Sequence, residues 1–234
     1  MNFKLKQIID ASMQLVPEVS IFCQRCLQTQ RWDGNVLLMV VDAAFTSIGL
    51  NYFHSVVPAV ELFRKRLVKT GKINRFNDLV TADGTELETL WRNKRSWFAA
   101  KAISAYLVSL QTSTVISDMD AFIRWGRKTS LDGWRADPVG KIKGVGINTY
   151  QYLRMMAGID TVMPDKIVKR VINGIFQEAG EPTPDSDIEF INVVEKVAPK
   201  LGYRPIELCW MTWLIQSEAN LIHMKKHSQI LSRI

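Results

Sequence analysis

The chain has 234 residues, of which 47% are hydrophobic and 23% charged, a composition that fits a soluble globular protein of one or two small domains. Lys and Arg number 30 against 23 Asp and Glu, and the net charge of +7 favours a polyanionic partner. No apolar run is long enough to span a membrane, and the first residues lack the apolar core of a secretory signal. Three cysteines form no disulfide framework. We therefore expect a protein that is cytoplasmic and nucleoid-associated in a prokaryote, or otherwise intracellular.

Helical periodicity runs through nearly the whole chain, and no strand pattern of convincing length interrupts it. The segment Gly180-Glu-Pro-Thr-Pro-Asp185 is the clearest linker. The fold class is therefore predicted to be all-α. The predicted helices cover residues 3–16, 36–48, 54–69, 85–91, 96–111, 149–157, 166–178, 187–199 and 205–225.

A tight hairpin is expected at Lys141-Ile-Lys-Gly-Val-Gly-Ile-Asn-Thr149, directly before a helix. Glycines let backbone N–H groups approach an anion, and a helix N-terminus adds partial positive charge. Lys141 and Lys143 flank the turn, so a phosphate is the expected anion. The alternative is a Gly-rich turn between two packed helices.

A single carboxylate, Asp165, precedes the basic run Lys166, Lys169 and Arg170. An acid beside a phosphate-binding hairpin indicates chemistry on nucleic acid. The alternative is that Asp165 caps the helix that follows Pro164, and both roles are compatible.

Several motifs together resemble the helix–hairpin–helix DNA glycosylases. Residues 143–150 are similar to the hairpin of that family, and Val162-Met-Pro-Asp-Lys-Ile-Val-Lys-Arg-Val-Ile172 is similar to the segment that carries its catalytic aspartate. Upstream, Phe76-Asn-Asp-Leu-Val-Thr-Ala-Asp83, Glu86-Leu-Glu-Thr-Leu-Trp91 and Ala99-Ala-Lys-Ala-Ile103 are similar to its entry helices. The resemblance covers residues 75–176 in the family's order.

The resemblance implies two helical subdomains with double-stranded DNA bound in the cleft between them. Residues 1–35 with 177–234 would form the terminal subdomain, and residues 36–176 the helical barrel with the hairpin and the catalytic segment. We expect a monomer without a cofactor, apart from a Na⁺ or K⁺ held by hairpin carbonyls that the resemblance implies.

The resemblance also assigns the chemistry. Asp165 would be the catalytic carboxylate that stabilises an oxocarbenium ion and orients or deprotonates water. Asn148 stands where bifunctional members carry a lysine, and an amide is not nucleophilic. The expected enzyme is therefore monofunctional and leaves an abasic site. The alternative for Asn148 is a helix-start residue that bonds its own backbone.

The DNA-binding residues are predicted around the hairpin and on the helix after Asp165. For Lys169 and Arg170 the alternative is a charge pair on a solvated helix face. The set is Lys141, Lys143, Gly144, Val145, Gly146, Asn148, Thr149, Lys169 and Arg170.

A base pocket is predicted around Asp42 and Trp91. Asp42 lies in the apolar segment 40–46, where it would contact or protonate a flipped base. Its alternatives are a cap between helices and a surface position. Tyr52 and Trp97 are further stacking candidates, although aromatics at helical spacing are more often core residues.

No metal is expected at the site. An iron–sulfur cluster of the family's kind needs four cysteines after the catalytic helix, and only Cys209 lies there. The pairs Cys23/Cys26 and His223/His227 have zinc-ligand spacing, so a structural zinc between them is an alternative.

The function expected from these features is a monofunctional DNA glycosylase that flips a damaged, mismatched or modified base and hydrolyses its N-glycosidic bond. One alternative is excision of hypermodified bases from phage DNA. Another is a non-catalytic DNA-binding module built on the hairpin.

Overall fold

The regular elements are helices in the described residues of the computed structural model, which are 2–115, 117–216 and 232–234. Within these ranges the one strand-type pairing is a bridge between Thr112 and Val115. The predicted all-α class is confirmed. The helices are α1 (Phe3–Gln14), α2 (Val19–Leu27), α3 (Arg31–Gly34), α4 (Val36–Thr46), α5 (Val57–Phe63), α6 (Phe76–Thr81), α7 (Gly84–Leu90), α8 (Lys94–Ser109), α9 (Asp118–Lys128), α10 (Ile147–Met156), α11 (Lys166–Ala179), α12 (Asp187–Lys200) and α13 (Pro205–Gln216), with π-helical turns η1 (Tyr52–Val56) and η2 (Arg64–Val68) on either side of α5.

Side chains close to each helix start explain why many helices begin where they do. Asn35 Oδ1 accepts a hydrogen bond from Leu38 N at 3.1 Å before α4, and Asn93 Oδ1 accepts from Ser96 N at 3.0 Å before α8. Because these bonds join residues three apart, the sequence alone sets these starts.

Three helices were not predicted: α2, the short α3 and α9. The signal for α9 is present, because Ser117 accepts from Asp120 N at 3.1 Å at its start and two basic residues end it. The predicted helix 205–225 corresponds to α13 as far as Gln216, and its remainder lies outside the described residues.

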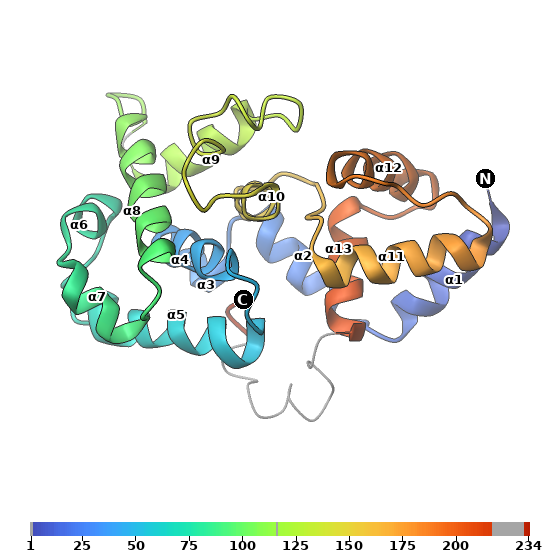
Figure 1. Cartoon of the computed structure of the whole chain (residues 1–234), viewed down its shortest axis with the longest axis horizontal. Coiled ribbons are helices and arrows are strands. Elements are labelled where there is room, and N and C mark those ends of the chain that lie inside the picture. Colours follow the sequence, from blue (N-terminus) through green and yellow to red (C-terminus); the bar gives the residue numbers. More distant parts are fainter. Residues whose placement is uncertain (1, 116, 217–231) are drawn as a thin grey trace.

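The helices form two groups (Figure 1). Helices α4 to α9 gather on one side, and α1, α11, α12 and α13 on the other, with α10 between them. α10 contacts both α4 and α2, while α11 packs against α1 and α13. The expected subdomain boundary at residue 176 falls inside α11.

Helix α4 lies at the centre of the core. All 11 of its residues are buried, and it packs against α8 and α10. One of these residues is Asp42, so the fold must supply hydrogen-bond donors to a carboxylate that water does not reach.

The segment before α10 departs from a regular helix–hairpin–helix. Residues 131–144 form successive turns, and α10 begins only at Ile147. The expected hairpin therefore follows turns rather than a regular first helix.

No helix within the described ranges is long and apolar enough to cross a membrane.

Candidate functional site

An open cleft of about 740 Å³ lies between the two groups of helices. One wall is the segment 46–53, which leads from the end of α4 into η1, and the other is the segment 164–170 at the start of α11. Asn148 of α10, Asp187 of α12 and Trp213 of α13 complete the lining. Segments distant in sequence therefore meet at one surface.

Asp165 lies in this cleft as the N-cap of α11. Its Oδ1 atom accepts a hydrogen bond from Ile167 N at 2.8 Å, which satisfies one free N–H of the first turn. Its Oδ2 atom has no donor among the described residues, and the side chain is partly exposed. The capping alternative is therefore realised, and the same residue lines the cleft.

The cations after Asp165 differ in their surroundings. Lys166 is exposed and lines the cleft. Lys169 Nζ lies 2.5 Å from Asp187 Oδ1, so this lysine already has a carboxylate partner. Arg170 is exposed and lines the cleft as well.

Asn148 is the second residue of α10 and lines the same cleft. Its Oδ1 atom is buried and has no hydrogen-bond partner in the described part of the chain. Asn148 and Asp165 therefore line the same cleft.

The hairpin turns at Gly144, whose φ of +97° is accessible to few other residues. Val145 N donates to Ile142 O at 2.9 Å, which closes the turn. Gly146 is the N-cap of α10 and provides no capping side chain, and no other described residue is seen to cap this helix through its side chain.

The predicted DNA-binding residues of the hairpin are not equally accessible. Lys141 and Lys143 are exposed, whereas Val145 and Thr149 are buried. A Cβ on Gly144 would lie 3.9 Å from Arg95 O, so the hairpin packs beside the start of α8. This contact brings the basic and aromatic run 92–98 next to the hairpin.

The two predicted base-pocket residues lie outside the cleft lining. The Trp91 ring stacks on Phe45, with ring centroids 4.6 Å apart and planes 9° apart. Asp42 is fully buried, so its alternative as a surface position is wrong.

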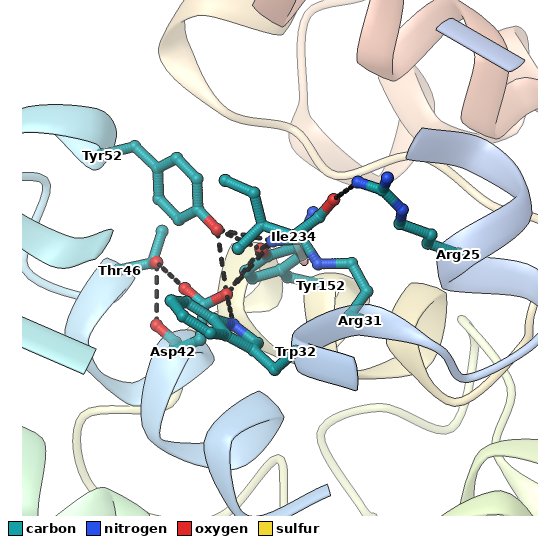
Figure 2. A network of polar contacts seen from close by, with 8 residues as sticks. All are labelled: Arg25, Arg31, Trp32, Asp42, Thr46, Tyr52, Tyr152 and Ile234. Atoms are coloured by element: carbon teal, nitrogen blue, oxygen red, sulfur yellow. Dashed lines mark hydrogen bonds and ion pairs between the residues drawn. The ribbon is translucent and has the colours of Figure 1, made fainter. Parts of the chain in front are cut away.

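Asp42 belongs to a polar network that sequence reasoning did not find (Figure 2). Four donor groups lie within hydrogen-bonding distance of its Oδ2 atom. They are Arg31 Nη2 at 3.2 Å, Trp32 Nε1 at 2.8 Å, the Tyr52 hydroxyl at 2.9 Å and the Tyr152 hydroxyl at 3.1 Å.

The network joins helices that are far apart in sequence. The Arg31 side chain is completely buried and also lies over the Trp210 ring of α13, 4.9 Å from its centroid. Burial raises the pKa of the Tyr52 and Tyr152 phenols, which therefore stay protonated and can donate to Asp42. Tyr52 also lines the cleft and so connects the network to it.

The backbone next to Arg31 is strained. Trp32 and Asp33 have φ values of +54° and +57°, in the left-handed region that non-glycine residues seldom adopt. The Trp32 amide donates to the Arg233 carbonyl, and Arg25 Nη1 donates to Ile234 O at 2.7 Å. Residue 233 thus binds the segment that presents Arg31, and Ile234 binds Arg25 of the preceding helix α2 (Figure 2 shows the contact of Ile234). No local pattern in the sequence signals this arrangement.

The cysteine pairs give no metal centre in the described part of the chain. Cys23 and Cys26 are both buried on α2, and no group of three or more His, Cys, Asp or Glu side chains in the described ranges could hold a metal ion. His223 and His227 lie outside the described residues. Burial raises the pKa of the Cys209 thiol to about 12.

The fold and the site define an all-helical protein with a partly exposed carboxylate in a cleft between two groups of helices. The chain belongs to a family described as a domain of unknown function (DUF8548), whose model matches residues 14–217. No curated protein matches the chain, and no solved structure does.

Proposed function

We propose that this protein is a monofunctional DNA glycosylase of the helix–hairpin–helix kind. It would flip a base from duplex DNA into the cleft and hydrolyse the N-glycosidic bond, which leaves an abasic site. In this proposal the two groups of helices are the two subdomains, and the turn at residues 141–146 with α10 is the DNA-binding hairpin.

The observation that carries the proposal is the environment of Asp165. Its Oδ1 atom is fixed by Ile167 N at 2.8 Å, which orients the carboxylate. The residue lines an open cleft, and its Oδ2 atom has no donor among the described residues. A fixed anion with a free oxygen is suited to stabilise positive charge on a sugar and to accept a proton from water.

The reaction balances with one water and one carboxylate. As the C1′–N bond breaks, its electron pair leaves with the base, and C1′ gains positive charge opposite Asp165. The water oxygen forms the new bond to C1′, and its proton goes to Asp165. The departing base then takes a proton from solvent, and Asp165 loses its proton in the next cycle.

Asn148 supports the monofunctional part of the proposal. It lines the cleft with Asp165, but its amide cannot form the Schiff base that strand cleavage by a lyase requires. The product would therefore be an intact strand with an abasic site.

Three surface features support duplex DNA as the partner. The N-terminus of α10 has no capping side chain, and the exposed Lys141 and Lys143 flank it, a combination that suits a phosphate. On the opposite wall of the cleft, Leu50 is 48% exposed. An exposed aliphatic side chain at a DNA-facing cleft can enter the base stack and fill the space of a flipped base.

The experiment is base release from a panel of end-labelled duplexes that contain uracil, 8-oxoguanine, alkylated bases, mismatches or hypermodified phage-type bases. Each reaction is divided, and one half is treated with alkali to cleave abasic sites. Asp165→Asn is the matched variant, because Asn also caps helices and keeps the shape of the side chain.

Strand breaks that need alkali and disappear in Asp165→Asn are the expected result, and the active duplex names the substrate. Release from hypermodified bases alone would assign the anti-phage role. Breaks without alkali would contradict the monofunctional mechanism. Salt-sensitive DNA binding without release from any duplex would replace the proposal with the DNA-binding module.

A further inference from the structure

The side-chain oxygen of Asn148 is in an unusual position for a polar atom. It is buried and has no hydrogen-bond partner within residues 2–115, 117–216 and 232–234, although an unpaired buried acceptor costs about 1–3 kcal/mol. The residue lines the cleft at the start of α10, next to the space that a bound molecule would occupy.

A second acceptor without a donor lies in the same cleft. Asp165 uses Oδ1 for Ile167 N at 2.8 Å, and its Oδ2 atom is left without a donor among the described residues. The two acceptors come from different elements, the first turn of α10 and the N-cap of α11. A water molecule has two O–H donors and commonly satisfies pairs of such groups.

We infer that Asn148 is a positioning residue that holds the attacking water for Asp165. The water donates one hydrogen bond to Asn148 Oδ1 and the other to Asp165 Oδ2. Its lone pair then points into the cleft, where C1′ of a flipped nucleotide would lie. This inference rests on the proposed glycosylase function and adds a second residue to its reacting centre.

The proton and electron balance is that of the hydrolysis described above. The proton on the Asp165 side passes to that carboxylate, while the hydrogen bond to Asn148 persists during attack. A neutral amide suits this task, because it orients the water without adding a second negative charge that would compete for the proton.

The test compares four proteins by single-turnover base release, using the duplex of the panel that the wild type processes fastest. They are the wild type, Asn148→Ala, Asn148→Asp and the control Asn173→Ala. Asn173 on α11 also has a buried Oδ1 atom without a partner, but it lies outside the cleft lining. Thermal unfolding and DNA affinity are measured for each protein.

We expect Asn148→Ala to lower the single-turnover rate about 10- to 100-fold with unchanged DNA affinity, because the water is no longer held at the correct angle. Asn173→Ala should keep the wild-type rate. In Asn148→Asp a second carboxylate beside Asp165 raises the pKa of one of them, so its rate should fall more at pH 5 than at pH 8. A purely structural role for Asn148 would not produce this pH dependence.

The failure of this inference is distinguishable from the failure of the glycosylase proposal. If Asp165→Asn abolishes release but Asn148→Ala reacts at the wild-type rate, this inference is overturned and the glycosylase stands. An Asn148→Asp rate that is lowered equally at every pH would also overturn it. If the wild type releases no base from any duplex, both are overturned.

Discussion

Asp42 and Asp165 are carboxylates of the same chain with opposite surroundings. Asp42 is fully buried on α4, and four donors lie within 3.2 Å of its Oδ2 atom. Asp165 is partly exposed at the start of α11, where it lines a cleft and has one backbone donor at 2.8 Å.

We interpret this difference as that between a structural carboxylate and the carboxylate that the proposed function makes catalytic. An oxygen that is saturated with donors cannot accept a further proton or contact a ligand without losing bonds that hold the core together. An oxygen without a donor can do both. Sequence context suggested a role in the site for both residues, whereas their hydrogen bonds support such a role only for Asp165.

The largest expected effect is on catalysis, from Asp165→Asn. We expect the rate of base release to fall about 10²- to 10⁴-fold, because the amide cannot accept the proton or stabilise positive charge. The free energy of unfolding should change by less than about 1 kcal/mol, since Asn caps helices as Asp does. Single-turnover kinetics and urea denaturation measure the two quantities. A loss of stability that matches the loss of rate would contradict the division between the two aspartates.

Asp42→Asn should have its main effect on stability. Removing the charge leaves Arg31 buried without an ionic partner, which lowers the free energy of unfolding by about 3–5 kcal/mol. Urea denaturation followed by circular dichroism measures the change.

A double variant, Arg31→Met with Asp42→Leu, is the control for Asp42→Asn. It removes both charges and should be more stable than Asp42→Asn, because no unpaired charge remains. Destabilisation below about 1 kcal/mol in Asp42→Asn would show that the network does not hold the core.

Tyr52→Phe tests the connection between the buried network of Asp42 and the cleft that Asp165 lines. The Tyr52 hydroxyl donates to Asp42, and the residue also lines the cleft. Loss of the hydroxyl should lower the free energy of unfolding by about 1.5–3 kcal/mol, as for hydrogen bonds to charged groups. Base release should stay within about threefold of the wild type, because the ring that lines the cleft is kept. Tyr203→Phe is the matched control, because its hydroxyl bonds the more exposed Asp10 at 2.7 Å and should contribute less.

The smallest effect is expected at Asp10, a partly exposed carboxylate. It has hydrogen-bond partners and lies outside the lining of the cleft. Hydrogen bonds from Lys6 and then Tyr203 lower the pKa of Asp10 from its ordinary 3.8. The folded protein therefore binds this proton more weakly than the unfolded chain. The resulting stabilisation is complete well above pH 3.8 and is lost as the pH falls through the lowered pKa.

Asp10→Asn should accordingly be less stable than the wild type at pH 6, and the difference should shrink towards pH 3. Thermal unfolding of both proteins across this range measures it. A difference that grows on acidification would contradict the assignment of these partners.

The sequence by itself determined the features that depend on near neighbours. The start of α11 at Asp165 follows from a bond between residues two apart, and that of α4 from a bond between residues three apart. Periodicity predicted most helices. The resemblance assigned Asn148 and Asp165 to one predicted site, and both residues line the same cleft. The Ser117–Asp120 pair is a local signal for the start of α9, a helix that the periodicity did not predict.

Only the tertiary structure decided which hydrogen-bond partners the buried polar groups have. Asp42 meets Tyr152, which is 110 positions away, and Arg31 lies against Trp210 of α13. Trp32 has a left-handed backbone conformation, and its amide donates a hydrogen bond to the Arg233 carbonyl. Whether a carboxylate is saturated or free depends on donors that arrive from distant segments when the core packs. A local pattern does not encode those donors, because hydrogen bonding is satisfied in three dimensions rather than along the chain.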